Sequence, residues 1–292
     1  LTIDVAGRLS VLNAGKIDGT TLSSGKGGDI AISARSVVID GSMAPGQFTG
    51  ISARSGVAAN GDAGKITLTV AEELIIAGAG KVSSSTFSEG NGGDIGLQAG
   101  SLTIDGSAAM DSSTGIFARS NPGATGDGGN LSIIIAGELA LLATGAISSD
   151  TSSVGKGGEV NIQTGSLHID GSIGPSTDIS ARSTSTGNAG RLKIDVKKQL
   201  SIIGGTISSA TSSTGEGGDV SITAQSLVIQ GTSSSQLAGI LAGSSSDASG
   251  QAGNGGDLTI SVAEEVLIAT GGVISSDTSA SGKGGVVTVN AG

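Results

Sequence analysis

A short motif that returns five times constrains the fold of this chain more than any other feature of its sequence. Its first copy is Gly27-Gly28-Asp29-Ile30-Ala31-Ile32: a glycine pair, an acid and alternating apolar residues. The glycines predict a turn that needs positive φ, and the alternation predicts a strand with one buried face. The copies begin near residues 27, 92, 157, 217 and 284, and their second glycines are Gly28, Gly93, Gly158, Gly218 and Gly285.

The stretches between these copies repeat as well. Each repeat divides into two similar halves, and each half holds three short, half-apolar segments separated by glycine or serine turns. Such strands are unstable alone, but stacking equivalent strands about 4.8 Å apart pairs their backbones and buries alternate side chains. The sequence therefore predicts an all-β parallel β-helix (β-solenoid) with three strands per coil, about nine coils and no helices of note. Residues 1–292 form one such domain, a rod of roughly 40–45 Å.

The alternation also assigns faces to the three walls of each coil. Ile30 and Ile32 point inward from the first wall, Val37 and Ile39 from the second, and Ile51 from the third. Further along the third wall the inward positions carry only small residues, which indicates a narrow corner. These are Ala53, Ala118, Ala181 and Ala242 from one half-repeat and Ser84, Ser149, Ser209 and Ser276 from the other.

Arginines recur on the outward face of the same wall, at Arg54, Arg119 and Arg182. The stacking places Asp150 between Arg119 and Arg182, and we expect a ladder of surface ion pairs there, worth about 0–1 kcal/mol per pair. The alternative is a row of arginines that binds an anion or a glycan.

Charge and composition exclude several partners. The net charge of −10 argues against nucleic acid and against docking on anionic lipid, because both need basic patches. The chain has no cysteine, so no disulfide and no cysteine-based metal site is expected. No apolar run approaches the roughly 18–20 residues of a membrane helix, so no membrane insertion is expected. Leu1 and Gly292 both lie inside repeats, which suggests a segment of a longer chain.

No group of residues has the types and spacing of a catalytic or ligand-binding site, and no catalytic residue, cofactor or metal site is expected. A carbohydrate-active enzyme remains an alternative, but the chain has three Phe and no Trp or Tyr to stack on sugars, and its acids fall on repeated positions. The Gly-Gly-Asp turns and the Ser/Thr rows leave a calcium-binding or an ice-binding solenoid as a further alternative. Calcium repeats, however, recur every nine residues or so, and these recur far less often.

Four motifs together suggest a family. The alternation of Gly-Gly-Asp-Ile-x-Ile, Ser-Leu-x-Ile-Asp-Gly, Gly-Ile-x-Ala-Arg-Ser and Gly-x-Ile-Ser-Ser-x-Thr over nearly the whole chain resembles the repeat region of filamentous-haemagglutinin-like exoproteins. These are proteins of two-partner secretion in Gram-negative bacteria and cyanobacteria. The resemblance implies a right-handed β-helix and export through an outer-membrane partner transporter. It also implies display on the cell surface of, or release from, a Gram-negative-type bacterium.

The expected function is therefore structural. The chain would be the rod of a secreted or cell-surface adhesin or of an extracellular filament, and not an enzyme. Its expected partners are further coils of the same kind, the transporter, and a glycan or protein on a host or neighbouring cell. The alternatives are a carbohydrate-active β-helix lyase or hydrolase and the calcium- or ice-binding solenoid.

Overall fold

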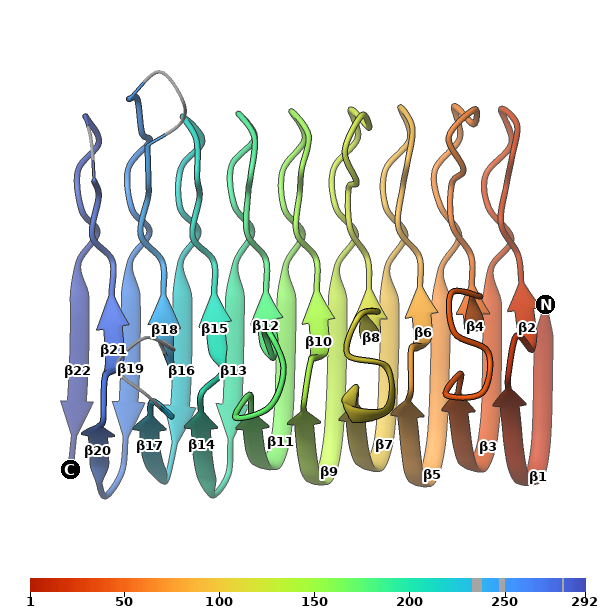
Figure 1. Ribbon diagram of the computed structural model, residues 1–292, viewed down its shortest axis with the longest axis horizontal. Coiled ribbons are helices and arrows are strands. Elements are labelled where there is room, and N and C mark those ends of the chain that lie inside the picture. Colours follow the sequence, from red (N-terminus) through yellow and green to blue (C-terminus); the bar gives the residue numbers. More distant parts are fainter. Residues whose placement is uncertain (233–237, 247–249, 280) are drawn as a thin grey trace.

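The computed structural model describes residues 1–232, 238–246, 250–279 and 281–292, and it shows an all-β solenoid of nine stacked coils (Figure 1). Every strand pairs in parallel with its equivalent in an adjacent coil, and those inside the stack pair on both sides, as the repeats predicted. Among the described residues the only helical element is one short 3-10 turn, η1 (Ser107–Ala109). No helix in this part of the chain has the length and hydrophobicity needed to cross a bilayer.

Two sheets make up the coils. The first sheet has thirteen strands: β1 (Thr2–Leu12), β3 (Ile30–Asp40), β5 (Ile66–Ala77), β7 (Ile95–Asp105), β9 (Leu131–Leu142), β11 (Val160–Asp170), β13 (Leu192–Val196), β14 (Gln199–Ile203), β16 (Val220–Ala224), β17 (Ser226–Gln230), β19 (Leu258–Val262), β20 (Val266–Ala269) and β22 (Val287–Ala291). The second sheet has nine short strands: β2 (Lys16–Asp18), β4 (Thr49–Ser52), β6 (Gly80–Ser83), β8 (Thr114–Phe117), β10 (Gly145–Ser148), β12 (Asp178–Ser180), β15 (Thr206–Ser208), β18 (Ala238–Leu241) and β21 (Gly272–Ser275).

The three expected walls are present, but the first two are not separated everywhere. From β1 to β11 they form one continuous strand that bends at a register shift, for example between Ala34 and Val37. In the later coils the same two walls are separate strands, such as β13 and β14. An extra residue on one strand lets a sheet bend without ending, so the corner needs no turn in the earlier coils.

The core is aliphatic and follows the predicted alternation. Ile30, Ile32, Val37, Ile39 and Ile51 are all at most 2% exposed. Each of these side chains stacks on its equivalent in the next coil, so the core runs as columns along the helix axis. Burying alternate side chains while pairing the backbone is the solution that strands this short require.

Beyond the third wall each coil narrows to a neck, where the ascending and descending chains cross (Figure 1). The amide of Gly129 donates to the carbonyl of Ala118 across this neck at 2.7 Å. The hydroxyl of Ser149 donates to the carbonyl of Gly129, and the amide of Gly158 donates to that hydroxyl at 3.1 Å. The Ala and Ser residues that the sequence placed at a narrow corner are all buried at this neck.

The motif glycines have a different role from the one expected. None of Gly28, Gly93, Gly158, Gly218 and Gly285 has positive φ, so the conformational explanation was wrong. Four of the five lie at the neck against the backbone of the preceding coil. At Gly158, for example, a Cβ would collide with the carbonyl of Gly129 and the hydroxyl of Ser149. Gly28, in the first coil, has more room.

Beyond the neck, each coil extends into an arm that stacks on its neighbours through single parallel bridges, such as Ser120 to Thr151. The opposite corner of the coil alternates. Coils of one kind carry a loop, at 41–48, 106–113 and 171–177, and the coils between them make a tight turn such as 143–144.

Candidate binding groove

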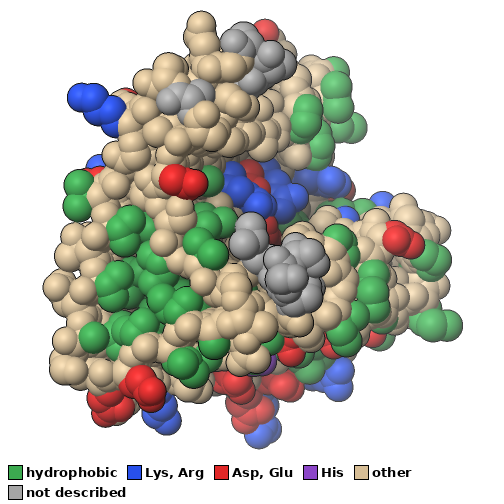
Figure 2. All heavy atoms as spheres, turned by 60° about the vertical axis from the view of Figure 1, so that its left-hand side comes forward, with side chains coloured by type: hydrophobic (Ala, Val, Ile, Leu, Met, Phe, Trp, Pro, Cys, Tyr) green, Lys and Arg blue, Asp and Glu red, His purple; other side chains and the backbone are tan. Residues whose placement is uncertain are grey.

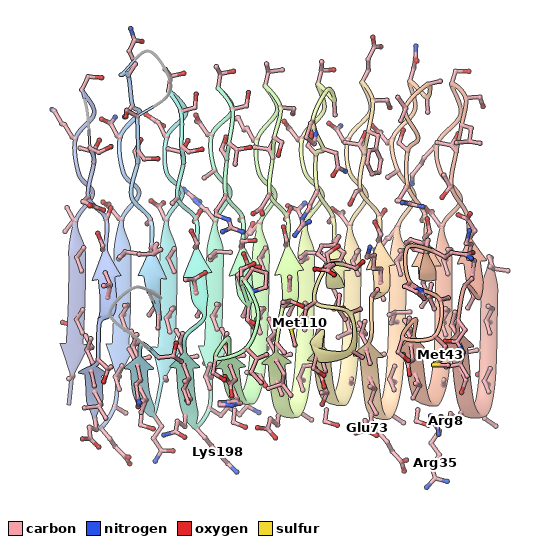
Figure 3. The ribbon with its side chains drawn as sticks, in the orientation of Figure 1. Arg8, Arg35, Met43, Glu73, Met110 and Lys198 are labelled. Atoms are coloured by element: carbon pink, nitrogen blue, oxygen red, sulfur yellow. The ribbon has the colours of Figure 1, made fainter. Side chains whose placement is uncertain are left out.

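The outward face of the nine-stranded sheet lies in a groove that runs along the helix axis. The arms form one rim, and the loops 41–48, 106–113 and 171–177 lie in front of the sheet as the other rim. Met43 and Met110 mark two of these loops in Figure 3. The space-filling view shows the molecule hollowed here, with basic and acidic side chains gathered inside (Figure 2).

Strand register defines the columns of side chains that line this groove. One column contains Ser52, Ser83, Phe117, Ser148 and Ser180. Two residues further on, just beyond the strand ends, the backbone hydrogen bonds continue the stacking and define a second column in the order that the sequence predicted: Arg54, Ser85, Arg119, Asp150, Arg182, Ala210.

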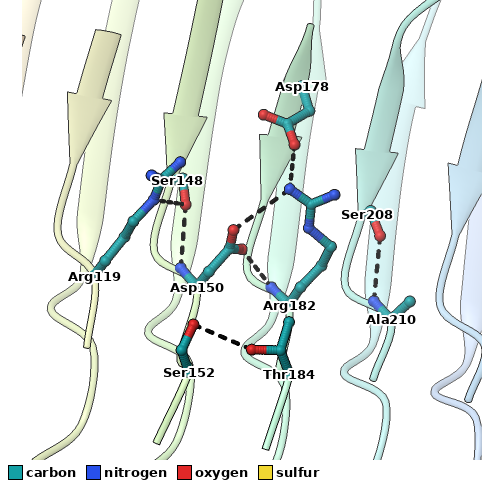
Figure 4. A network of polar contacts seen from close by, with 9 residues as sticks. All are labelled: Arg119, Ser148, Asp150, Ser152, Asp178, Arg182, Thr184, Ser208 and Ala210. Atoms are coloured by element: carbon teal, nitrogen blue, oxygen red, sulfur yellow. Dashed lines mark hydrogen bonds and ion pairs between the residues drawn. The ribbon is translucent and has the colours of Figure 1, made fainter. Parts of the chain in front are cut away.

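The predicted ladder in this column forms only in part. Nη2 of Arg182 lies 3.4 Å from Oδ2 of Asp150, and the amide of Arg182 donates to Oδ1 of the same carboxylate at 2.7 Å (Figure 4). Arg119 makes no such pair with Asp150; its Nε donates to the hydroxyl of Ser148 at 2.6 Å, and its guanidinium carbon lies 4.3 Å from the ring centroid of Phe117.

A second carboxylate, which the sequence analysis missed, completes the ion pairs. Arg182 also binds Asp178, whose side chain is only 5% exposed. Burial raises the pKa of the Asp178 carboxyl, and the charge of Arg182 opposes that rise. The network is therefore a half-buried cluster on the floor of the groove, not a ladder on an open surface.

The cluster borders a pocket of about 260 Å³. Arg119, Asp178 and Arg182 line its floor, and residues of the loops 106–113 and 171–177 form its sides. The tight turn at 143–144 leaves this space open between the two loops. The hydroxyl of Thr144, which also lines it, is buried and has no hydrogen-bond partner.

Toward the first coil the groove is basic. Lys81 lies on β6 between the coils that carry Arg54 and Arg119. The guanidinium carbon of Arg54 lies 4.5 Å from the ring centroid of Phe48 and 5.9 Å from that of Phe87. Burial, together with the charges of Arg54 and Arg119, lowers the pKa of the Lys81 amine.

The acids of the repeated motif have a structural role elsewhere. Oδ1 of Asp29 accepts a hydrogen bond from the amide of Lys65 at 2.8 Å, and Oδ1 of Asp94 accepts one from the amide of Asn130 at 2.9 Å. Each acid thus binds the backbone of the following coil. A shallow depression of about 500 Å³ follows this row of side chains.

This role accounts for the Gly-Gly-Asp motif without calcium. Asn130 continues the row in the same way, with its Oδ1 accepting from the amide of Glu159 at 2.9 Å, so the row needs an acceptor and not a charge. Within the described residues, no group of three or more His, Asp or Glu side chains is arranged to hold a metal ion.

Comparison with protein-family models, with curated proteins and with solved structures found no match to this chain.

The sequence predicted the column of Arg119, Asp150 and Arg182 but not the two residues that most change its chemistry. Lys81 and Asp178 occupy equivalent positions on strands of the two kinds of half-repeat, and neither belongs to a recurring motif. The available signal was that Asp178 departs from the glycines, Ala146 and Thr206 of the same column, and that Lys81 shares its position with Lys16 of the first coil.

Proposed function

We propose that this chain is a structural rod of a secreted or cell-surface adhesin or extracellular filament, exported by a two-partner route as its resemblance to filamentous-haemagglutinin-like repeats implies. The observation that carries the proposal is that the inward and the outward positions of the coils differ in how much their residues vary. Inward positions stay aliphatic and neck positions stay small from coil to coil, whereas outward residues change in charge and size along the groove. Such a repeat maintains a scaffold and varies the surface it presents.

Display can be tested directly on cells that carry the gene. Antibodies raised against the 292-residue chain should label intact cells or detect the protein in the medium. Deleting the gene of the partner transporter should confine it inside the cell. Labelling that requires lysed cells, or export that survives the deletion, would contradict the proposal.

One observation favours the enzymatic alternative. Asp150 and Asp178 converge on Arg182 beside a pocket, and paired carboxylates in a groove are typical of sites that cleave polysaccharides. Both oxygens of Asp150 are engaged by Arg182, however, which favours an ion-pair cluster.

The alternative has a simple assay. The purified chain is incubated with acidic and neutral polysaccharides, and new reducing ends and unsaturated sugars are measured. The structural proposal expects none. Cleavage that is lost in Asp178→Asn would establish the enzyme instead.

A further inference from the structure

The basic end of the groove is an unusual feature in a chain whose net charge is −10. Arg54, Lys81 and Arg119 come from three successive coils and converge on one stretch of the floor. We call these three residues the basic cluster. The five ion pairs among the described residues include none of them. Asp150 and Asp178 act on Arg119, and Asp18 acts on Arg54, only from beyond ion-pair distance.

The neighbours of the basic cluster keep it open. Lys81 pairs in register with Gly50 on one side and Gly115 on the other, so no side chain covers it along its column. Between the two arginines the column holds only Ser85. The three cations therefore line one stretch of the groove floor, with the two arginines two coils, or about 10 Å, apart.

Aromatic contacts hold the arginines in place without neutralising them. Arg54 stacks on Phe48 and Phe87, and Arg119 stacks on Phe117. These are all the aromatic residues of the chain. The Nε of Arg54 donates to the hydroxyl of Ser52, and that of Arg119 to the hydroxyl of Ser148. Stacking leaves the terminal N–H groups of a guanidinium at its open edge, and such a planar, preoriented donor suits a carboxylate.

The rest of the groove restricts the kind of anion that fits. Asp150 lies one coil after Arg119, with Asp178 on the next, whereas the coil before Arg54 carries Asp18 together with Lys16. A polymer with a negative charge on every unit would be repelled where it passes Asp150 and Asp178. A chain whose charges are separated by neutral units can place one anionic group on the cations and neutral units over the acids.

From this arrangement we propose that the basic cluster binds a carboxylate of an acidic polysaccharide in which acidic and neutral sugars alternate, lying along the groove. This goes beyond the role of a rod and does not depend on where the chain is displayed.

Titration calorimetry of the 292-residue chain tests the proposal. The probe is an oligosaccharide of alternating glucuronate and N-acetylglucosamine. We expect binding that weakens with added salt, and loss of at least about tenfold in affinity in Lys81→Gln, the range for removing one charged hydrogen-bond donor. Lys81→Arg should retain affinity. Lys193→Gln, which removes an exposed charge on the other sheet, should change it by less than about twofold.

Three other ligands decide the chemical class. The same oligosaccharide with its carboxylates reduced to alcohols should not bind. This comparison uses the unsubstituted chain, so it does not depend on the folding of a variant. A polyuronate and polyglutamate, charged on every unit, should bind more weakly than the alternating chain. Equal binding of the reduced oligosaccharide, tighter binding of either fully charged polymer, or unchanged affinity in Lys81→Gln would each overturn the proposal.

Discussion

At the scale of the residue, the neck makes the sharpest demand on the sequence. Gly158 lies against the carbonyl of Gly129, and a methyl group there has no room. We expect Gly158→Ala to lower the free energy of unfolding by about 1–3 kcal/mol, the usual cost of overpacking. The measurement is the midpoint of urea unfolding.

Gly96 provides the matched control. It lies on β7 with no atom within 4 Å of a Cβ position, and its φ is not positive. Gly96→Ala should leave stability unchanged or raise it slightly. Equal destabilisation by the two substitutions would mean that the close approach at the neck is not the reason for the motif glycines.

The buried ion pair gives a second prediction at this scale. Burial raises the pKa of Asp178 above its ordinary 3.8, with Arg182 opposing. For an acid whose pKa is higher in the folded state, the stabilising contribution is complete below about pH 3.8 and is lost as the pH rises through the folded-state pKa. Removing Arg182 raises that pKa further.

Arg182→Gln should therefore cost about 1–3 kcal/mol near neutral pH, and the loss should shrink as the pH falls toward 4. Unfolding curves measured across this pH range check the trend. Arg35→Gln, which breaks the exposed pair with Glu72, is the control and should cost at most about 1 kcal/mol. A loss in Arg182→Gln that is the same at every pH would contradict the assignment of a raised pKa.

At the scale of the element, the aspartate of the repeated motif secures the turn in three of its five copies, at Asp29, Asp94 and Asp219. Oδ1 of Asp94 accepts hydrogen bonds from the amide and the side chain of Asn130 in the next coil. Asp94→Ala should cost about 1 kcal/mol, the net value of such a bond, while Asp94→Asn should be close to neutral because the acceptor remains. Thermal unfolding of the two variants, with and without added calcium, measures this.

The outcome separates the structural role from a calcium site. A structural acceptor predicts that Asn substitutes for Asp and that calcium leaves the unfolding temperature unchanged. If Asp94→Asn is as damaging as Asp94→Ala, and calcium stabilises the unsubstituted chain, the turn binds the ion.

The elements also show why the sequence predicted some features and not others. Period-two alternation predicted the inward faces of Ile30 and Ile51, because burial repeats with the strand. The small residues predicted a narrow corner, but the crossing of two segments there was not foreseen, because it is set by how coils stack and not by local propensity. Asp178 was missed for a related reason: its burial depends on the loop 171–177 folding over the groove.

At the scale of the whole molecule, all the site arguments depend on one stacking register. The order Arg54, Ser85, Arg119, Asp150, Arg182 exists only if each coil pairs with the next as the repeats align. A shift by one residue in any coil would exchange its inward and outward faces and disperse the basic cluster. The register is therefore the central claim.

Disulfide crosslinking tests this register directly, since the chain has no cysteine of its own. Thr69 and Gln98 are exposed register partners on β5 and β7. Adjacent partners in a sheet lie within the Cα separation that a disulfide spans, whereas a pair offset by two residues does not. We predict that Thr69→Cys with Gln98→Cys forms an intramolecular disulfide under mild oxidation, identified by mass spectrometry, and that Thr67→Cys with Gln98→Cys does not. Crosslinking of the offset pair in preference to the aligned pair would contradict the stacking on which the solenoid and its groove depend.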